Sequence, residues 1–158
     1  MALWIIYMFY VEKIVVMNKI SVSDLSVGDW VCAEQLCGVH SKPRLTPPMK
    51  VGGLGDGAGG WVNLMIDPEQ GDPFEFEPSE IRGVPITAEV LEKNGWQKIP
   101  YSDKIYTIDG ENYSLVYYIE GNVADFRRES DRCSITCNYI HELQHALRLV
   151  NVGKEVVL

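Results

Sequence analysis

The sequence has few basic residues, few histidines and no apolar run long enough to cross a membrane. Its 158 residues include 14 Lys and Arg against 22 Asp and Glu, which gives a formal net charge of −8. Residues 1–80 hold 11 acids and 5 bases, and residues 81–158 hold 11 and 9. Nucleic-acid binders and proteins of anionic membrane surfaces rely on Lys and Arg to neutralise phosphate groups. The charge balance therefore argues against both kinds of partner.

The apolar run at residues 2–11 is too short for a bilayer, which takes about 20 residues. It also lacks the basic start and small-residue cleavage site of a secretory signal. Two interpretations of residues 1–16 stay open: a strand that continues into residues 14–16, or an extension translated from an early start codon before Met17. Without an export signal, four cysteines indicate reduced thiols and a cytoplasmic location.

The patterning predicts an α+β fold in which a small β-barrel-like half is followed by a short helix, an antiparallel hairpin sheet and a C-terminal amphipathic helix. We expect an N-terminal extension at 1–16, a β-rich lobe at 17–84 and an α+β lobe at 85–158, with the two lobes sharing one core. In the first lobe a turn leads into a strand at 27–31. The expected elements after it are a proline-containing loop or irregular edge at 39–51, a glycine loop at 52–60 and a strand at 61–66.

The second lobe carries clearer local signals. Residues 86–95 predict a short helix with Thr87 as its N-cap and Asn94-Gly95 at its end. Asp109-Gly110, between two apolar segments, predicts a β-hairpin. The remaining elements are expected at 123–127 and 133–136 (strands), 138–150 (a helix capped by Asn138) and 156–158 (a strand or tail).

One motif points to a specific chemistry. His141-Glu142-Leu143-Gln144-His145 matches the H-E-x-x-H pattern of zinc metallopeptidases. In that pattern two histidines one helical turn apart bind Zn²⁺, and the glutamate acts on the metal-bound water as a general base. Under this interpretation His141 and His145 are metal ligands and Glu142 is catalytic.

Two features of the surrounding sequence weaken the zinc interpretation. A catalytic zinc needs a third protein ligand, but the extended motif is absent and the one other histidine is His40. At 3.6 residues per turn, the apolar stripe of the last helix contains Ile140, Leu143, Leu147 and Val150. His141 and His145 lie on the opposite face with Arg148, so they are expected to point to solvent unless another lobe covers them. We therefore favour a surface helix and keep the zinc peptidase as an alternative.

Two weaker motifs favour structural interpretations. Residues 55–60 match G-x-G-x-x-G, but they lead into a strand, whereas a dinucleotide fingerprint opens a helix. The cysteines at 32, 37, 133 and 137 have wider spacing than the C-x₂-C pairs of zinc tetrathiolate sites, so buried cysteines are expected instead.

Residues 67–80 form the most acidic segment, with six acids and no base. We expect an exposed turn followed by a short strand at 74–77, in which alternation places both phenylalanines on one face. Such a segment can dock on a basic partner or imitate a phosphate backbone.

From about residue 17 onward the chain resembles a family of uncharacterised proteins from phages, prophages and mobile elements of Bacteroides-type gut bacteria. The segments at 24–31, 83–96 and 139–147 carry the resemblance. It implies an accessory protein in the cytoplasm of a bacterial host. It also implies that the His-x-Leu-Gln core is kept while the second histidine is often missing, which gives His141 and Gln144 a structural or docking role. The family offers no known activity to transfer.

These observations predict a non-enzymatic protein-binding module that needs no cofactor and contacts neither nucleic acid nor membrane. The two alternatives are the zinc peptidase and an acidic DNA mimic that inhibits a nucleic-acid-binding enzyme. The expected contact residues belong to the acidic segment and to the polar face of the last helix: Asp67, Glu69, Asp72, Glu75, Glu77, Glu80, His141, Gln144, His145 and Arg148.

Overall fold

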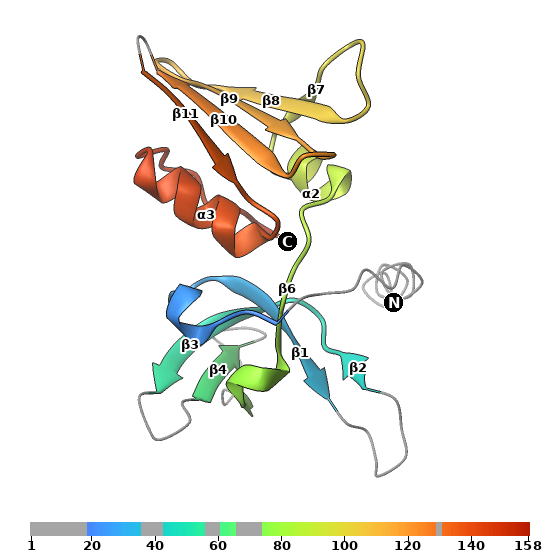
Figure 1. Ribbon diagram of the computed structural model, residues 1–158, viewed down its shortest axis with the longest axis vertical. Coiled ribbons are helices and arrows are strands. Elements are labelled where there is room, and N and C mark those ends of the chain that lie inside the picture. The colour runs from blue at the N-terminus through green and yellow to red at the C-terminus, as the bar shows by residue number, and fades with distance from the viewer. Residues whose placement is uncertain (1–18, 36–42, 56–60, 66–73, 129–130) are drawn as a thin grey trace. The chain divides into compact units, whose positions relative to one another are not determined.

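The computed structural model describes residues 19–35, 43–55, 61–65, 74–128 and 131–158. The chain divides into two compact units, unit 1 (Met1–Val84) and unit 2 (Pro85–Leu158). Each unit has its own antiparallel sheet, and both α-helices of the described residues belong to unit 2 (Figure 1). The fold is mostly β with a C-terminal helix, in agreement with the predicted α+β class.

Unit 1 is built from short strands. Its sheet is ordered β6-β1-β3-β4-β5, and β2 also pairs with β1. The elements are η1 (Val22–Asp24), β1 (Trp30–Gln35), β2 (Arg44–Leu45), β3 (Met49–Gly55), β4 (Trp61–Met65), β5 (Phe74–Phe76), η2 (Pro78–Glu80) and β6 (Ile81–Gly83). Its core is a cluster of buried aliphatic and aromatic side chains that includes Val31, Met49, Val51, Val62 and Ile81.

A buried arginine fastens β6 to β1. The Arg82 guanidinium donates to the Glu34 carboxylate at 2.5 Å and to the carbonyl oxygens of Ser79 and Ile81. Buried charges need such pairing, because an isolated charge is strongly disfavoured away from water. The pair therefore ties η2 and β6 to the strand beside them.

The described strands of unit 1 do not form a closed barrel, in contrast to the expected β-barrel-like half. Its sheet ends at β5 and β6, and these two strands do not pair with each other in the described part of the unit. A barrel requires its end strands to pair at a matched stagger, and here each end strand has only three residues. The sequence shows strand-forming segments but not whether the last one reaches the first.

The glycine-rich segment also differs from the prediction. Residues 52–55 continue β3, with a shift of register against β4 between Val51 and Gly53. Glycine inside a strand often marks such a bulge. The expected loop is therefore wrong for residues 52–55, and residues 56–60 lie outside the described residues.

Unit 2 contains a five-stranded antiparallel sheet ordered β11-β10-β9-β8-β7. Its elements are α2 (Ala88–Lys93), β7 (Gln97–Lys98), β8 (Ile105–Asp109), β9 (Ser114–Tyr118), β10 (Val123–Arg128), β11 (Asp131–Thr136) and α3 (Ile140–Leu149). The predicted α2 is confirmed: Thr87 Oγ1 accepts the Val90 N–H at 3.3 Å, and Gly95 follows with a φ of 82°. The predicted hairpin is confirmed too, with a four-residue loop because Asp109 pairs with Ser114.

The two faces of the unit 2 sheet differ in burial. The core face carries buried side chains at Tyr106, Ile108, Leu115, Tyr117, Ala124 and Phe126. Figure 1 shows α2 and α3 on one side of the sheet, and the Tyr106 hydroxyl donates to Glu92 of α2 at 3.2 Å. The opposite face, called here the outer face, is formed by the alternate residues of each strand. Most of these are exposed or half-buried.

The C-terminal segment is neither helix nor strand, but it is anchored. Asn94 Oδ1 accepts the Val157 N–H at 2.7 Å, and Asn94 Nδ2 donates to the Val157 carbonyl at 2.8 Å. Val156 beside it is buried. Of the two predictions for residues 156–158, the tail is correct.

Among the described residues there is no helix with the length and apolar character needed to cross a membrane.

Candidate functional site

The start of α3 determines what Glu142 does. Its Oε2 accepts the backbone N–H of Asn138 at 2.5 Å and that of Tyr139 at 3.1 Å. Tyr139, not the predicted Asn138, is the N-cap, so Glu142 is the third residue of the helix. A carboxylate at this position satisfies amides that have no acceptor within the helix. Glu142 is therefore a capping residue, a task that competes with the role of general base.

The H-E-x-x-H histidines are less exposed than predicted. His141 is 2% exposed and Gln144 is 4% exposed, while His145 is half-buried and Arg148 is exposed. His141 is therefore not exposed to solvent, whereas Arg148 is. Helical periodicity locates the apolar stripe, and Ile140, Leu143 and Leu147 are indeed buried. It cannot show that burial extends around the helix beyond that stripe.

The two imidazoles are neighbours, as the i, i+4 spacing requires. Their ring centroids lie 6.1 Å apart at an interplanar angle of 82°. Tyr139 stacks on His141 with centroids 5.9 Å apart. The described residues contain no group of three or more His, Cys, Asp or Glu side chains arranged to hold a metal, and His40 lies outside them. The described geometry thus brings two of the expected ligands together and supplies no third.

Of the four cysteines, three are described. Cys32 and Cys137 are buried and Cys133 is exposed, while Cys37 lies outside the described residues. Burial raises the pKa of Cys32 to about 12 and, together with the charge of Glu142, raises that of Cys137 to about 12. Both thiols therefore stay protonated at neutral pH.

The acidic segment is described only in part. Asp67, Glu69 and Asp72 lie outside the described residues, Glu75 and Glu77 are exposed, and Glu80 is half-buried. Glu80 Oε2 accepts the Glu77 N–H at 2.8 Å, which caps η2. The predicted strand is confirmed as β5, which pairs only with β4 among the described strands.

The two phenylalanines of β5 differ in exposure: Phe74 is 51% exposed and Phe76 is buried. The segment from β5 to the start of η2 therefore presents an exposed aromatic ring and, at alternate positions, the exposed carboxylates of Glu75 and Glu77. We call these three residues the β5 edge.

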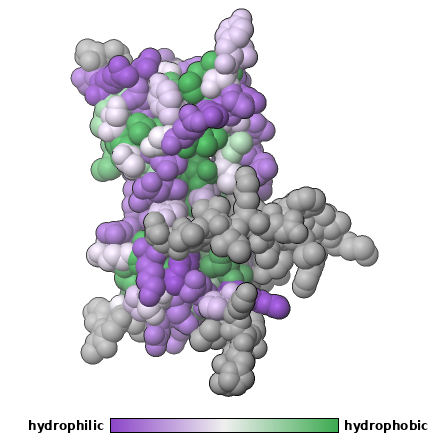
Figure 2. Space-filling model, turned by 45° about the vertical axis from the view of Figure 1, so that its right-hand side comes forward, coloured by the Kyte–Doolittle hydropathy of each residue, from purple (hydrophilic) through white to green (hydrophobic). Residues whose placement is uncertain are grey.

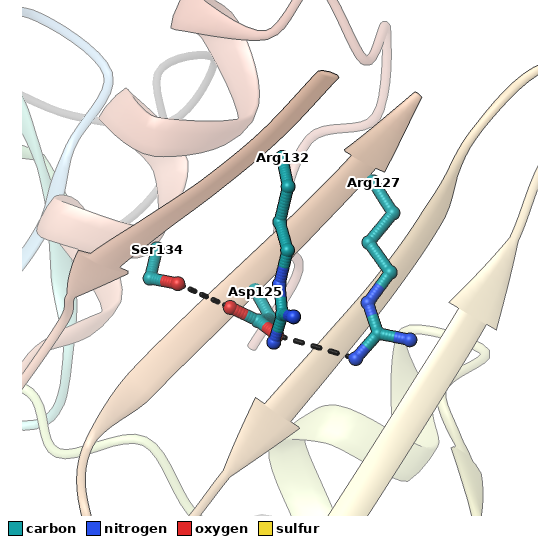
Figure 3. Close-up of polar contacts among 4 residues, drawn as sticks. All are labelled: Asp125, Arg127, Arg132 and Ser134. Carbon is teal, nitrogen blue, oxygen red and sulfur yellow. Dashed lines mark hydrogen bonds and ion pairs between the residues drawn. The ribbon is translucent and has the colours of Figure 1, made fainter. Parts of the chain in front are cut away.

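A second charged cluster, which the sequence patterning did not indicate, lies on the outer face of unit 2. Asp125 on β10 is 3% exposed. Its Oδ2 accepts hydrogen bonds from Arg132 Nη2 at 2.6 Å and from Arg127 Nη2 at 3.3 Å, and its Oδ1 accepts one from the Ser134 hydroxyl. Figure 3 shows these side chains converging on Asp125 from two adjacent strands. We call the four residues the Asp125 cluster.

Strand register explains why these four residues meet. Asp125 is directly opposite Ser134, and Arg127 is directly opposite Arg132. Residues two apart on a strand share a face. The four side chains are therefore nearest neighbours on one face of the β10–β11 pair. The sequence signal is Asp-x-Arg in one strand and Arg-x-Ser in the next, which becomes informative only once the pairing is known.

The cluster changes the acidity of Asp125. The Ser134 hydrogen bond, followed by those from Arg132 and Arg127, lowers the pKa of Asp125 below its ordinary value, although burial acts in the opposite direction. Asp125 is therefore a carboxylate at neutral pH, and its charge holds both guanidinium groups in place.

Exposed hydrophobic side chains are scattered among the described residues. On the face visible in Figure 2, hydrophilic residues predominate and hydrophobic ones form smaller areas between them. The large apolar side chains that are exposed in the described residues come from separate places in the chain, such as Val27, Tyr101 and Leu149. The β5 edge and the Asp125 cluster are therefore the features with the most distinctive contact chemistry.

Comparison with known proteins gives no identification, since no protein-family model matches the chain and no curated protein or solved structure is detectably similar to it.

Proposed function

We propose that this chain is a non-enzymatic protein-binding module, of the phage or mobile-element type that its sequence resemblance indicates. The observation that carries the proposal is the β5 edge. An end strand of the unit 1 sheet presents Phe74, half exposed, and, at alternate positions, the exposed carboxylates of Glu75 and Glu77.

The chemistry of an end strand supports this proposal. Its outward backbone N–H and C=O groups can pair with an extended segment of another protein. An exposed aromatic side chain provides an anchor, since such residues dominate binding energy at interfaces. The carboxylates attract a basic partner and speed its association. They also repel a second copy of the same strand, which favours a foreign partner over self-association.

Helix α3 offers fewer accessible residues for partner binding than the sequence predicts. Burial gives His141 and Gln144 a structural role in this proposal, and it leaves His145 and Arg148 as the accessible residues of α3. The zinc-peptidase alternative has less support, because Glu142 is engaged as a helix cap. The DNA-mimic alternative remains a prediction, since half of its carboxylates (Asp67, Glu69 and Asp72) lie outside the described residues.

The test is affinity capture from a bacterial host lysate, followed by direct binding measurements with the purified partner. The variant Phe74→Ser/Glu75→Lys/Glu77→Lys should lose the partner that the wild type retains. Glu111→Lys/Glu155→Lys is the matched control, because it reverses two exposed charges in unit 2. A partner that binds the β5 variant as tightly as the wild type would refute the β5 edge as the contact surface.

A further inference from the structure

We propose that the Asp125 cluster is a binding site for a phosphate group, with Arg127 and Arg132 as the residues that contact it. The proposal concerns the outer face of unit 2 and does not depend on the β5 edge, which belongs to unit 1.

The geometry places two guanidinium groups side by side. Both donate to the same oxygen of Asp125, so the donating nitrogens lie within about 6 Å of each other. The Arg127 side chain is 49% exposed and the Arg132 side chain is 64% exposed. Each donates through one nitrogen to Asp125, so most of its N–H groups remain available to a ligand.

Asp125 fixes the two arginines and offsets only one of their two positive charges. Two guanidinium groups and one carboxylate leave the cluster with one net positive charge in a chain whose net charge is −8. The carboxylate is itself buried, and Ser134 occupies its other oxygen. Because the arginines are already oriented, a ligand loses less side-chain entropy when it binds them.

The described neighbours of the cluster place no second carboxylate beside the two arginines. Ser114 of β9 is directly opposite Arg127, and its side chain belongs to the same face. Among the described residues, the next carboxylate of that face is Asp109, which is opposite Ser114 and therefore two strands from Arg127, a distance of roughly 10 Å. Glu129 lies outside the described residues. Arg128 belongs to the core-side face and is directly opposite Asp131, so it does not belong to the cluster.

Phosphate fits two adjacent guanidinium groups better than a carboxylate does. The two oxygens of a carboxylate are satisfied by the fork of one arginine, whereas a phosphate monoester has three terminal oxygens and up to two charges. Two arginines from neighbouring strands can therefore bind different oxygens of the same phosphate. Arginine is favoured over lysine at such sites because its donors are planar and fixed in direction.

The experiment is a titration of ¹⁵N-labelled protein with inorganic phosphate, followed through the Nε–Hε signals of the arginines. We expect saturable shifts for Arg127 and Arg132, and an affinity about tenfold weaker in Arg127→Gln and Arg132→Gln. Arg132→Lys keeps the charge but loses the planar fork, so its affinity should be intermediate. The control Arg128→Gln removes the same charge one residue away and should bind phosphate as the wild type does.

Two further arms identify the ligand and its source. A phosphoserine peptide that binds more tightly than inorganic phosphate would indicate a phosphate carried by a protein, and equal affinity would indicate free phosphate. Unchanged amide spectra in the variants establish that they are folded. The proposal is overturned by non-saturable shifts, by acetate that binds as tightly as phosphate, or by an Arg128→Gln variant that is weakened as much as the cluster variants.

Discussion

The role of Glu142 as a helix cap leads to a quantitative prediction. Replacing it with alanine removes the acceptor of two backbone N–H groups, those of Asn138 and Tyr139. Loss of a cap costs about 0.5–2 kcal/mol, and loss of a negative charge in the first turn of a helix adds about 0.3–1 kcal/mol. We therefore expect Glu142→Ala to destabilise α3 by about 1–2 kcal/mol. In a unit of this size that corresponds to a fall in Tm of roughly 4–8 °C for each kcal/mol.

Glu142→Gln is the informative companion to this variant. Glutamine keeps an acceptor oxygen and occurs at this position of capping boxes, so it should retain at least half of the stabilisation. A peptidase predicts the reverse pattern, in which either substitution abolishes hydrolysis and stability is little changed. Glu111→Ala serves as the control, because it removes an exposed acid from the β8–β9 loop of the same unit.

Amide hydrogen exchange across α3 is the appropriate assay, because it reports the opening of one helix even if the two units unfold separately. Protection should fall at residues 140–149 in Glu142→Ala and stay near the wild-type level in Glu111→Ala. Equal protection in Glu142→Ala and the wild type would refute the capping role and restore Glu142 as a candidate base.

Three other predictions concern Asp125, Asn94 and His145. Because the folded-state pKa of Asp125 is lowered, its ion pairs stabilise the protein above the unfolded-state pKa and are lost as the pH falls through the folded-state pKa. Denaturant unfolding should show the wild type roughly 1 kcal/mol more stable than Asp125→Asn at pH 7, a modest value because solvent screens the arginines. The gap should close at acidic pH, and Asp109→Asn should show no comparable gap. Asn94→Ala should speed amide exchange at Val157, because both hydrogen bonds to that residue are lost; unchanged exchange would contradict this anchoring. Protein purified without a tag should contain far less than one zinc per chain by plasma mass spectrometry, and stoichiometric zinc that His145→Ala abolishes would revive the peptidase alternative.

Local structure in unit 2 follows from its sequence more directly than in unit 1. Thr87, Gly95 and the Asp109-Gly110 pair act through backbone groups within a few residues of themselves, so short-range rules place α2 and the β8–β9 hairpin correctly. Unit 1 depends on pairing between distant segments, such as β1 with β6. A pattern of alternating residues does not specify which strands will pair. The strand pattern therefore predicts a barrel-like sheet, whereas the end strands of the described sheet do not pair with each other.

The Asp125 cluster shows the same limit at the level of a site. Each of its four residues is unremarkable in sequence, and Arg127 and Arg132 look like ordinary exposed residues of a hairpin. Their proximity to a buried carboxylate arises only from the β10–β11 register. Strand register is set by turn geometry and core packing, and a prediction from residue types alone includes neither.

The H-E-x-x-H motif shows what a residue pattern leaves out. The pattern specifies that two histidines share a helix face, but it does not specify where the helix begins. At the third helical position a glutamate lies next to backbone amides that have no acceptor within the helix, and it binds them. One full turn later those amides are already satisfied, and the carboxylate is available for a metal-bound water. Here the helix begins at Ile140, so Glu142 falls on the capping position. The start of the helix, more than the spacing of the histidines, separates a cap from a catalytic base.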